Sequence, residues 1–176
     1  EVVDLANFLI KMGAQIEGAG TRRIIIEGVK ELHGAKHEVI PDRIEAGTFL
    51  IAGAMAGREV TLTRTNPEHL QSLIVPLTKA GVSITSQADT VTVKSNGTCR
   101  PLHLETLPYP GFPTDLQAQF MALQLLVEGR SPITEKIYPA RFMHAAELQR
   151  MGADIATDGA TATVAGGLPL SGAPVM

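Results

Sequence analysis

The chain has 176 residues, of which 44% are hydrophobic and 19% charged, a balance typical of a globular protein that buries a sizeable core. A formal net charge of -3 provides no overall basic field, so no nucleic-acid partner is expected. The single cysteine, Cys99, excludes an internal disulfide, and the longest apolar run, near residues 49–57, is too short to span a bilayer, so we expect a cytoplasmic protein with no membrane partner.

Three segments share one plan, in which a helix ends at a glycine and is followed by a strand, a turn and a second strand. They are residues 10–28, 78–97 and 149–167. The glycines that end the helices are Gly13, Gly81 and Gly152. Glycine suits the left-handed cap of a helix, and alternating β-branched residues such as those at 90–93 are typical of a half-buried strand. The sequence therefore predicts three β-hairpins, each preceded by a helix.

Two stretches in or just after the first segment resemble ligand motifs, and neither supports a ligand site. The stretch GAGTRR, residues 18–23, lies between two predicted strands and does not open a helix, so we interpret it as a hairpin turn rather than a phosphate-binding loop. The stretch HGAKH holds His33 and His37 at a ligand-like spacing, but Gly34 disfavours a helix that would bring both rings to one face. No metal site is predicted.

A second shared segment precedes each of the two later hairpins. It gives a proline, an acid at a helix start, an apolar helix, a glycine and a strand, at residues 39–64 and 108–134. Another helix is expected between that strand and the hairpin, at residues 67–80 and 142–151. The repeating unit is therefore βαβαββ with a period of roughly 70 residues. Two units are visible, at about 37–97 and 102–167, and residues 1–36 end an earlier one.

Each unit packs two helices on one face of a small four-stranded sheet, which is an α/β layer arrangement. The helices at residues 49–55 and 120–127 are apolar nearly all round, so we expect them to be buried. The predicted architecture is a buried helix pair within an outer shell of sheets.

Asp115 follows Phe112, Pro113 and Thr114 at the start of the second apolar helix, and Asp42 holds the equivalent place in the first. Asp is a preferred N-cap, so the residues alone favour a capping role for both acids, shared at the second helix by Thr114. A carboxylate at a helix N-terminus is also held in its ionised form by free N–H groups, which suits a base oriented by a rigid element.

Four stretches carry a family resemblance. They are FPTDLQAQFMAL at 112–123, RFMHAAELQRMGADI at 141–155, PDRIEAGTFLIAGA at 41–54 and ANFLIKMGAQIEGAGTRRIIIEGV at 6–29. Together they closely resemble the bacterial UDP-N-acetylglucosamine enolpyruvyl transferases over essentially the whole chain. The resemblance implies two domains, each an inside-out α/β barrel of three βαβαββ units, with a cleft between them. On that pattern the chain is a fragment from the middle to later part, with residues 1–36 ending a unit of the first domain. Residues 37–176 then hold two units of the second domain and the start of the next segment.

The resemblance implies a reaction with two substrates and no cofactor. The enolpyruvyl group of phosphoenolpyruvate passes to the 3-hydroxyl of UDP-N-acetylglucosamine through a tetrahedral intermediate, with release of phosphate, as the first committed step of peptidoglycan synthesis. Asp115 matches the family's general base, and Arg141 matches the arginine that faces phosphoenolpyruvate. Ile137 matches a main-chain contact to the uridine nucleotide.

Without the resemblance, Arg141 is expected to be a solvated surface residue and Ile137 a core residue. A guanidinium nevertheless offers a planar fork to carboxylate or phosphate oxygens. Cys99, in the turn NGTCRP, is outside the family's reactive-cysteine motif and is not expected to be a nucleophile.

The rest of the polypeptide is expected to complete the cleft, so the chain alone is expected to be inactive. Two alternatives stay open: the sister transferase that acts on shikimate 3-phosphate, and a non-catalytic fragment or binding module of the same fold.

Overall fold

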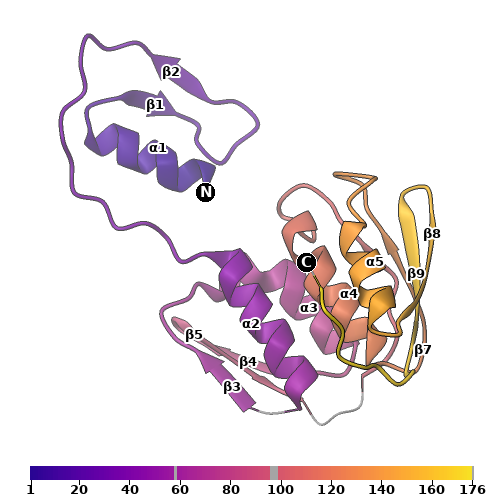
Figure 1. The fold of residues 1–176 in the computed structure, drawn as a ribbon. Helices are drawn as coiled ribbons and strands as arrows, with labels where there is room; N and C mark the ends of the chain where they lie inside the picture. Colours follow the sequence, from indigo (N-terminus) through magenta and orange to yellow (C-terminus); the bar gives the residue numbers. More distant parts are fainter. Residues whose placement is uncertain (58, 96–98, 176) are drawn as a thin grey trace. The chain divides into compact units, whose positions relative to one another are not determined.

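The structure is a computed structural model that describes residues 1–57, 59–95 and 99–175. It divides into two compact units, Glu1–Pro41 and Asp42–Met176 (Figure 1). The first three residues of the predicted turn NGTCRP, residues 96–98, lie outside the described residues. Over the described stretches, no helix combines the length and the apolar character needed to cross a membrane.

The first unit consists of a helix and a hairpin. Helix α1 (Val2–Lys11) is followed by strands β1 (Gln15–Glu17) and β2 (Ile25–Glu27), which pair antiparallel with Gln15 opposite Glu27. The glycine-rich stretch between the strands is a turn in which the Thr21 amide donates to the Gly18 carbonyl at 3.0 Å. Both the hairpin and the turn predicted from the sequence are therefore confirmed.

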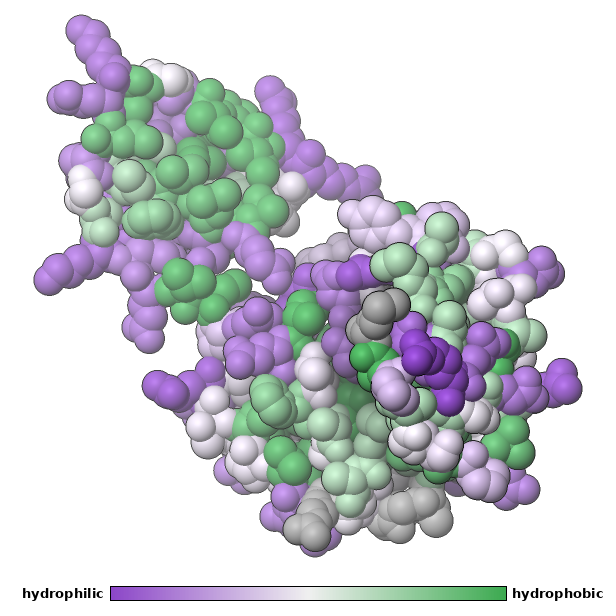
Figure 2. Space-filling view, in the orientation of Figure 1, coloured by the Kyte–Doolittle hydropathy of each residue, from purple (hydrophilic) through white to green (hydrophobic). Residues whose placement is uncertain are grey.

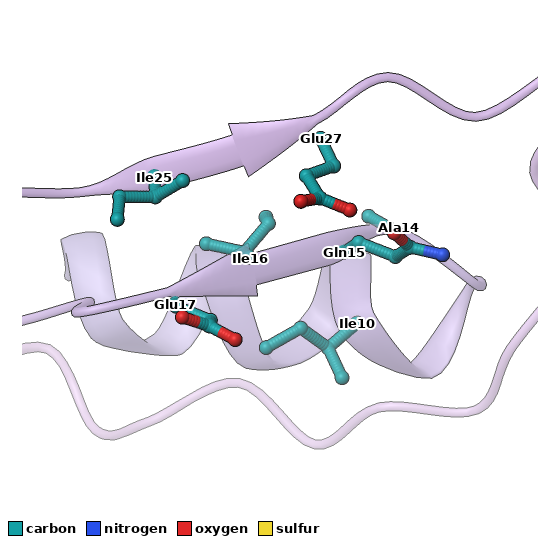
Figure 3. A pocket seen from close by; sticks show the side chains of 7 residues that line it. All are labelled: Ile10, Ala14, Gln15, Ile16, Glu17, Ile25 and Glu27. Atoms are coloured by element: carbon teal, nitrogen blue, oxygen red, sulfur yellow. The ribbon is translucent and has the colours of Figure 1, made fainter.

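Apolar side chains cover much of the surface of this unit, as the green atoms over it in Figure 2 show. Its exposed large apolar residues are Val2, Val3, Leu5, Ile10, Ile24, Ile25, Ile26, Val29, Leu32 and Val39. Between α1 and the hairpin, Ile10, Ile16 and Ile25 line a pocket of about 350 Å³ together with polar residues at the strand ends (Figure 3). The helix and hairpin alone are too small to bury this surface.

The strand predicted to open the first complete repeat, near residues 37–40, is not formed. His37 lies instead against α1, where its Nε2 is 2.9 Å from Asp4 Oδ1 and its ring stacks on Phe8 at 5.2 Å. These contacts hold the start of the segment within the first unit. The prediction of a four-stranded sheet in this repeat is therefore wrong for the described residues.

The second unit begins with the remainder of that repeat. Its elements are α2 (Arg43–Ala56), β3 (Glu59–Leu62), η1 (Pro67–Leu70), α3 (Gln71–Lys79), β4 (Ser83–Gln87) and β5 (Thr90–Lys94). The strands form an antiparallel sheet in the order β3-β5-β4. Gly13, Gly81 and Gly152 have φ near +100°, which confirms the predicted left-handed ends of the three helices.

The next repeat is a complete βαβαββ unit. Its elements are β6 (Leu104–Glu105), η2 (Thr114–Leu116), α4 (Gln117–Leu125), β7 (Gly129–Thr134), α5 (Met143–Arg150), β8 (Asp154–Asp158) and β9 (Thr161–Gly166). The sheet order is β6-β7-β9-β8, in which β6 and β7 run parallel and the other pairs antiparallel. The α/β repeat predicted from the sequence is confirmed here.

Helices α2 and α4 pack against each other, α2 on β3 and β5 and α4 on β7 and β9 (Figure 1). Leu50, Ile51 and Phe120 are at most 1% exposed, so the predicted buried helix pair is confirmed. Burial all round is wrong for α2, however, because Phe49 is 54% exposed, whereas Leu126, which is 50% exposed, lies just after the end of α4. The described residues leave one side of α2 uncovered and no residue of α4 exposed.

Candidate active site

The start of α4 and the loop after β7 meet at a pocket of about 640 Å³, lined by Asp115, Tyr138, Pro139, Ala140 and Arg141. Because α4 lies in the core and β7 is a central strand of its sheet, both sides of the pocket are attached to rigid elements. Two of the three residues predicted as site residues line this pocket.

Asp115 and Arg141 form an ion pair, with Arg141 Nη1 2.7 Å from Asp115 Oδ1. The same Nη1 donates to Thr114 Oγ1 at 3.1 Å, and the guanidinium carbon lies 5.8 Å from the centre of the Tyr138 ring. Both charged side chains remain partly open to solvent, 53% for Asp115 and 41% for Arg141. A carboxylate and a guanidinium are therefore presented side by side at an accessible surface.

The two equivalent acids at the helix starts have different partners. Asp42 caps α2, since its Oδ1 accepts from the amides of Ile44 at 2.7 Å and Glu45 at 3.1 Å. The second helix opens with the 3-10 turn η2, which has no side-chain cap. The capping role of Asp42 is thus confirmed, and the capping role expected from the residues alone for Asp115 and Thr114 is wrong. Asp115 is instead paired with Arg141, and the Thr114 hydroxyl donates to Glu135 at 2.8 Å.

Ile137 lies in the loop between β7 and the pocket. Its amide donates to Glu135 Oε1 at 2.9 Å, and the amide of Tyr138 donates to the same oxygen at 3.0 Å. With its N–H engaged, Ile137 has its carbonyl as the main-chain group that a ligand could contact.

Glu135 was not singled out by the sequence motifs, although it joins the elements around the pocket. Its side chain is fully buried and also accepts hydrogen bonds from Thr106 Oγ1 at 2.5 Å and Gln117 Nε2 at 3.3 Å. Burial acts to raise its pKa. The hydrogen bonds from the Thr106 and Thr114 hydroxyls and from the two loop amides outweigh burial, so the pKa of Glu135 lies below its ordinary value.

A signal for Glu135 exists in the sequence. Along β7 and the residue after it, Ser131, Ile133 and Glu135 are buried and alternate with less buried neighbours. Period-two alternation, continued one residue past the end of β7, therefore places Glu135 on the same buried face as Ser131 and Ile133. An acid on a buried strand face must be paired or hydrogen-bonded, which marks it as a candidate for a special role.

His144, at the start of α5, lies near this site. Burial first, and then the positive charge of Arg141, lower its pKa, so the neutral ring is favoured. Its Nε2 is buried and has no hydrogen-bond partner among the described residues. Cys99 lies elsewhere and is partly buried; burial raises its pKa and disfavours the reactive thiolate.

Comparisons with known proteins give the family. The model of a family described as EPSP synthase (3-phosphoshikimate 1-carboxyvinyltransferase) matches residues 1–176, the whole chain. The chain belongs to the EPSP synthase family. Three curated relatives that cover the whole chain are each named UDP-N-acetylglucosamine 1-carboxyvinyltransferase. They come from Geotalea daltonii, Koribacter versatilis and Akkermansia muciniphila, at 56%, 54% and 55% identity.

The chain spans 41–42% of the length of these relatives. Among solved structures, the enolpyruvyl transferase NikO from Streptomyces tendae matches 96% of the chain with a TM-score of 0.83 at 29% identity, over 41% of its own length. An EPSP synthase from Acinetobacter baumannii matches 97% of the chain with a TM-score of 0.59 at 19% identity, over 40% of its length, and shares the fold. The expected resemblance and the enolpyruvyl transferase fold are therefore confirmed.

Proposed function

We propose that the protein containing this chain transfers the enolpyruvyl group of phosphoenolpyruvate to the 3-hydroxyl of UDP-N-acetylglucosamine and releases phosphate. The observation that carries this proposal is the 54–56% identity, along the whole chain, to relatives named for that activity. The reaction would supply peptidoglycan synthesis and so the cell wall. Both substrates, a nucleotide sugar and a glycolytic intermediate, are cytoplasmic metabolites, which supports a cytoplasmic location for the protein.

Asp115 is the proposed general base. Its Oδ1 is paired with Arg141, and this pairing orients the carboxylate. The second oxygen, Oδ2, is then the one that can accept a proton from the sugar hydroxyl. The hydroxyl oxygen then attacks C2 of phosphoenolpyruvate while C3 takes up a proton from solvent, which balances the proton removed by Asp115 and gives the tetrahedral adduct. Loss of a C3 proton to solvent and cleavage of the C2–O bond to phosphate then restore the C2=C3 double bond and leave the enolpyruvyl ether and inorganic phosphate.

Arg141 is the proposed anion-binding group. Its guanidinium keeps its charge and carries further N–H donors besides the Nη1 group that contacts Asp115 and Thr114. These donors suit the carboxylate or phosphate of phosphoenolpyruvate and the charge that develops in the adduct. Ile137 is proposed to contact the uridine nucleotide through its carbonyl.

We propose that the rest of the polypeptide completes the cleft. Residues 1–36 are proposed to end a repeat unit of the first domain, and residues 37–176 to supply two units of the second domain and the start of the next segment. Two observations support this assignment: the relatives are longer, and the first unit exposes a broad apolar surface. The isolated chain is accordingly expected to have no activity.

The test is phosphate release by the full-length protein given phosphoenolpyruvate with either UDP-N-acetylglucosamine or shikimate 3-phosphate. Release that requires the nucleotide sugar and is lost in Asp115→Asn supports the proposal. Release with shikimate 3-phosphate alone moves the assignment to the sister transferase, for which the family description is the supporting observation. Release with neither acceptor leaves a binding module of the same fold.

A further inference from the structure

Both carboxylate oxygens of the buried Glu135 are occupied by donors from three parts of the second unit. Oε1 accepts from the hydroxyl of Thr106, the residue after β6, and from the amides of Ile137 and Tyr138. Oε2 accepts from Thr114 and Gln117 at the start of α4. The Lys136 amide donates in turn to Thr106 Oγ1 at 2.9 Å. One carboxylate thus ties the end of the sheet, the start of the helix and the loop after β7 together.

Thr114 connects Glu135 to the ion pair at the pocket. A hydroxyl has a single hydrogen, and Thr114 donates it to Glu135 Oε2 at 2.8 Å. The lone pairs of Thr114 Oγ1 thereby point toward other donors. Arg141 Nη1 donates to one of these lone pairs, at 3.1 Å. The buried negative charge orients the hydroxyl, and the hydroxyl orients the arginine.

Gln117 provides a second connection, to the main chain of Arg141. Its Nε2 donates both to Glu135 Oε2 at 3.3 Å and to the Arg141 carbonyl at 3.1 Å. Gln117 is fully buried, so this link is shielded from water. Glu135 is therefore linked to the side chain of Arg141 through one residue, Thr114, and to its backbone through another, Gln117.

We propose that Glu135 is a positioning residue that fixes Arg141 beside Asp115 and so sets the geometry of the enolpyruvyl transfer step. It is buried behind these residues and reaches the substrates through Thr114 and Arg141 rather than by contact. This inference rests on the proposed function. It adds a residue that neither the sequence motifs nor the proposed mechanism includes.

The variant Glu135→Gln keeps the shape and removes one acceptor oxygen. Its NH₂ group would face either the donors on the Oε1 side or those of Thr114 and Gln117, so at least one buried donor loses its partner. Misplacement of reacting groups by about 1 Å costs up to ~100-fold in rate. We expect kcat of the full-length protein to fall by ~10- to 100-fold.

The matched control is Glu105→Gln. Glu105 ends β6 and is also paired, with Lys136 Nζ at 2.8 Å, but its side chain is 39% exposed and it is not among the residues that line the pocket. Phosphate release is measured for both variants, with kcat normalised to the folded fraction given by circular dichroism at the assay temperature. A role in folding alone lowers the folded fraction but leaves the normalised kcat unchanged.

A double-mutant cycle with Thr114→Val tests the route of the effect and does not depend on one variant. Valine matches the shape of threonine but lacks the hydroxyl that links Glu135 to Arg141. If Glu135 acts through Thr114, adding Glu135→Gln to Thr114→Val lowers the normalised kcat by less than about threefold, because coupled residues are not additive.

The outcomes separate the inference from the proposed function. A normalised kcat at least tenfold lower for Glu135→Gln, an unchanged Glu105→Gln and a non-additive cycle support the inference. A wild-type protein that turns over while Glu135→Gln matches it within twofold, or losses that simply multiply in the cycle, overturn the inference alone. A wild-type protein that releases no phosphate with either acceptor overturns the proposed function and the inference with it.

Discussion

Gly53, on the buried face of α2, gives a sharp test of how closely this helix packs on its sheet. A Cβ atom at this position would lie 2.7 Å from Val93 Cγ1 and 3.0 Å from Val60 Cγ2. Both neighbours are β-branched residues on strands β5 and β3, so their side chains have little rotamer freedom with which to move away. The methyl group added by Gly53→Ala would therefore clash with two side chains that cannot easily move away.

Two effects of opposite sign decide the result. Alanine is favoured over glycine in a helix interior by ~1 kcal/mol. Inserting a methyl group into a packed core costs ~1–3 kcal/mol. We expect the packing cost to prevail and to leave a net loss of about 1 kcal/mol, which corresponds to a fall of ~2–4 °C in Tm for a chain of this size.

The assay is thermal unfolding of the 176-residue chain followed by circular dichroism, with Ala52→Gly as the matched variant. Ala52 is the exposed neighbour of Gly53 in the same helix, so its change measures helix propensity without packing. If Gly53→Ala raised Tm by as much as Ala52→Gly lowers it, the close approach would cost nothing and the reasoning would be refuted.

Three further predictions concern the acids Asp42, Asp115 and Glu135. Asp42→Ala, which removes the cap from two amides, is expected to lower stability by ~1 kcal/mol in urea unfolding, and Asp42→Asn by only a few tenths. Asp115→Asn in the full-length protein is expected to abolish phosphate release while shifting stability by less than ~1 kcal/mol, because its ion pair is exposed; a large loss of stability would contradict this view. The pKa of Glu135 is lowered from 4.5, so the stability it contributes is present above that pH and is lost as the pH falls through the folded-state value. Urea midpoints of Glu135→Gln are therefore expected to depend less on pH below 4.5 than those of the parent chain, and equal slopes would contradict this.

Local patterns were sufficient to predict the hairpins and the repeating unit. Glycine at a left-handed helix end and β-branched alternation are properties of neighbouring residues, and all three hairpins formed as predicted. The strand expected near residues 37–40 did not form because His37 contacts residues of α1 that are distant in the sequence. His37 is held by Asp4 and Phe8, 33 and 29 positions earlier, and no local pattern reveals such contacts.

The candidate site was less accessible to local reasoning. Asp42 and Asp115 have similar surroundings in the sequence, and capping statistics apply equally to both. Tertiary partners distinguish them, because Arg141 lies 26 positions after Asp115 and takes its carboxylate. Only the resemblance to a known family connected these two residues in advance. Glu135 was not predicted as a site residue because an acid between Thr134 and Lys136 is expected at the surface. Only the alternation of β7, extended by one residue past its end, places Glu135 on the buried face.

The hydrogen bonds of Glu135 also bear on the order in which the molecule folds. They join residues separated by 29 positions at Thr106, 21 at Thr114 and 18 at Gln117. Each bond closes a loop whose entropy must be lost before the bond can form, whereas the β8–β9 hairpin closes locally. We therefore expect the pocket to assemble late, after β6 has docked on β7. Substitutions at Glu135 should accordingly accelerate unfolding and leave the refolding rate nearly unchanged.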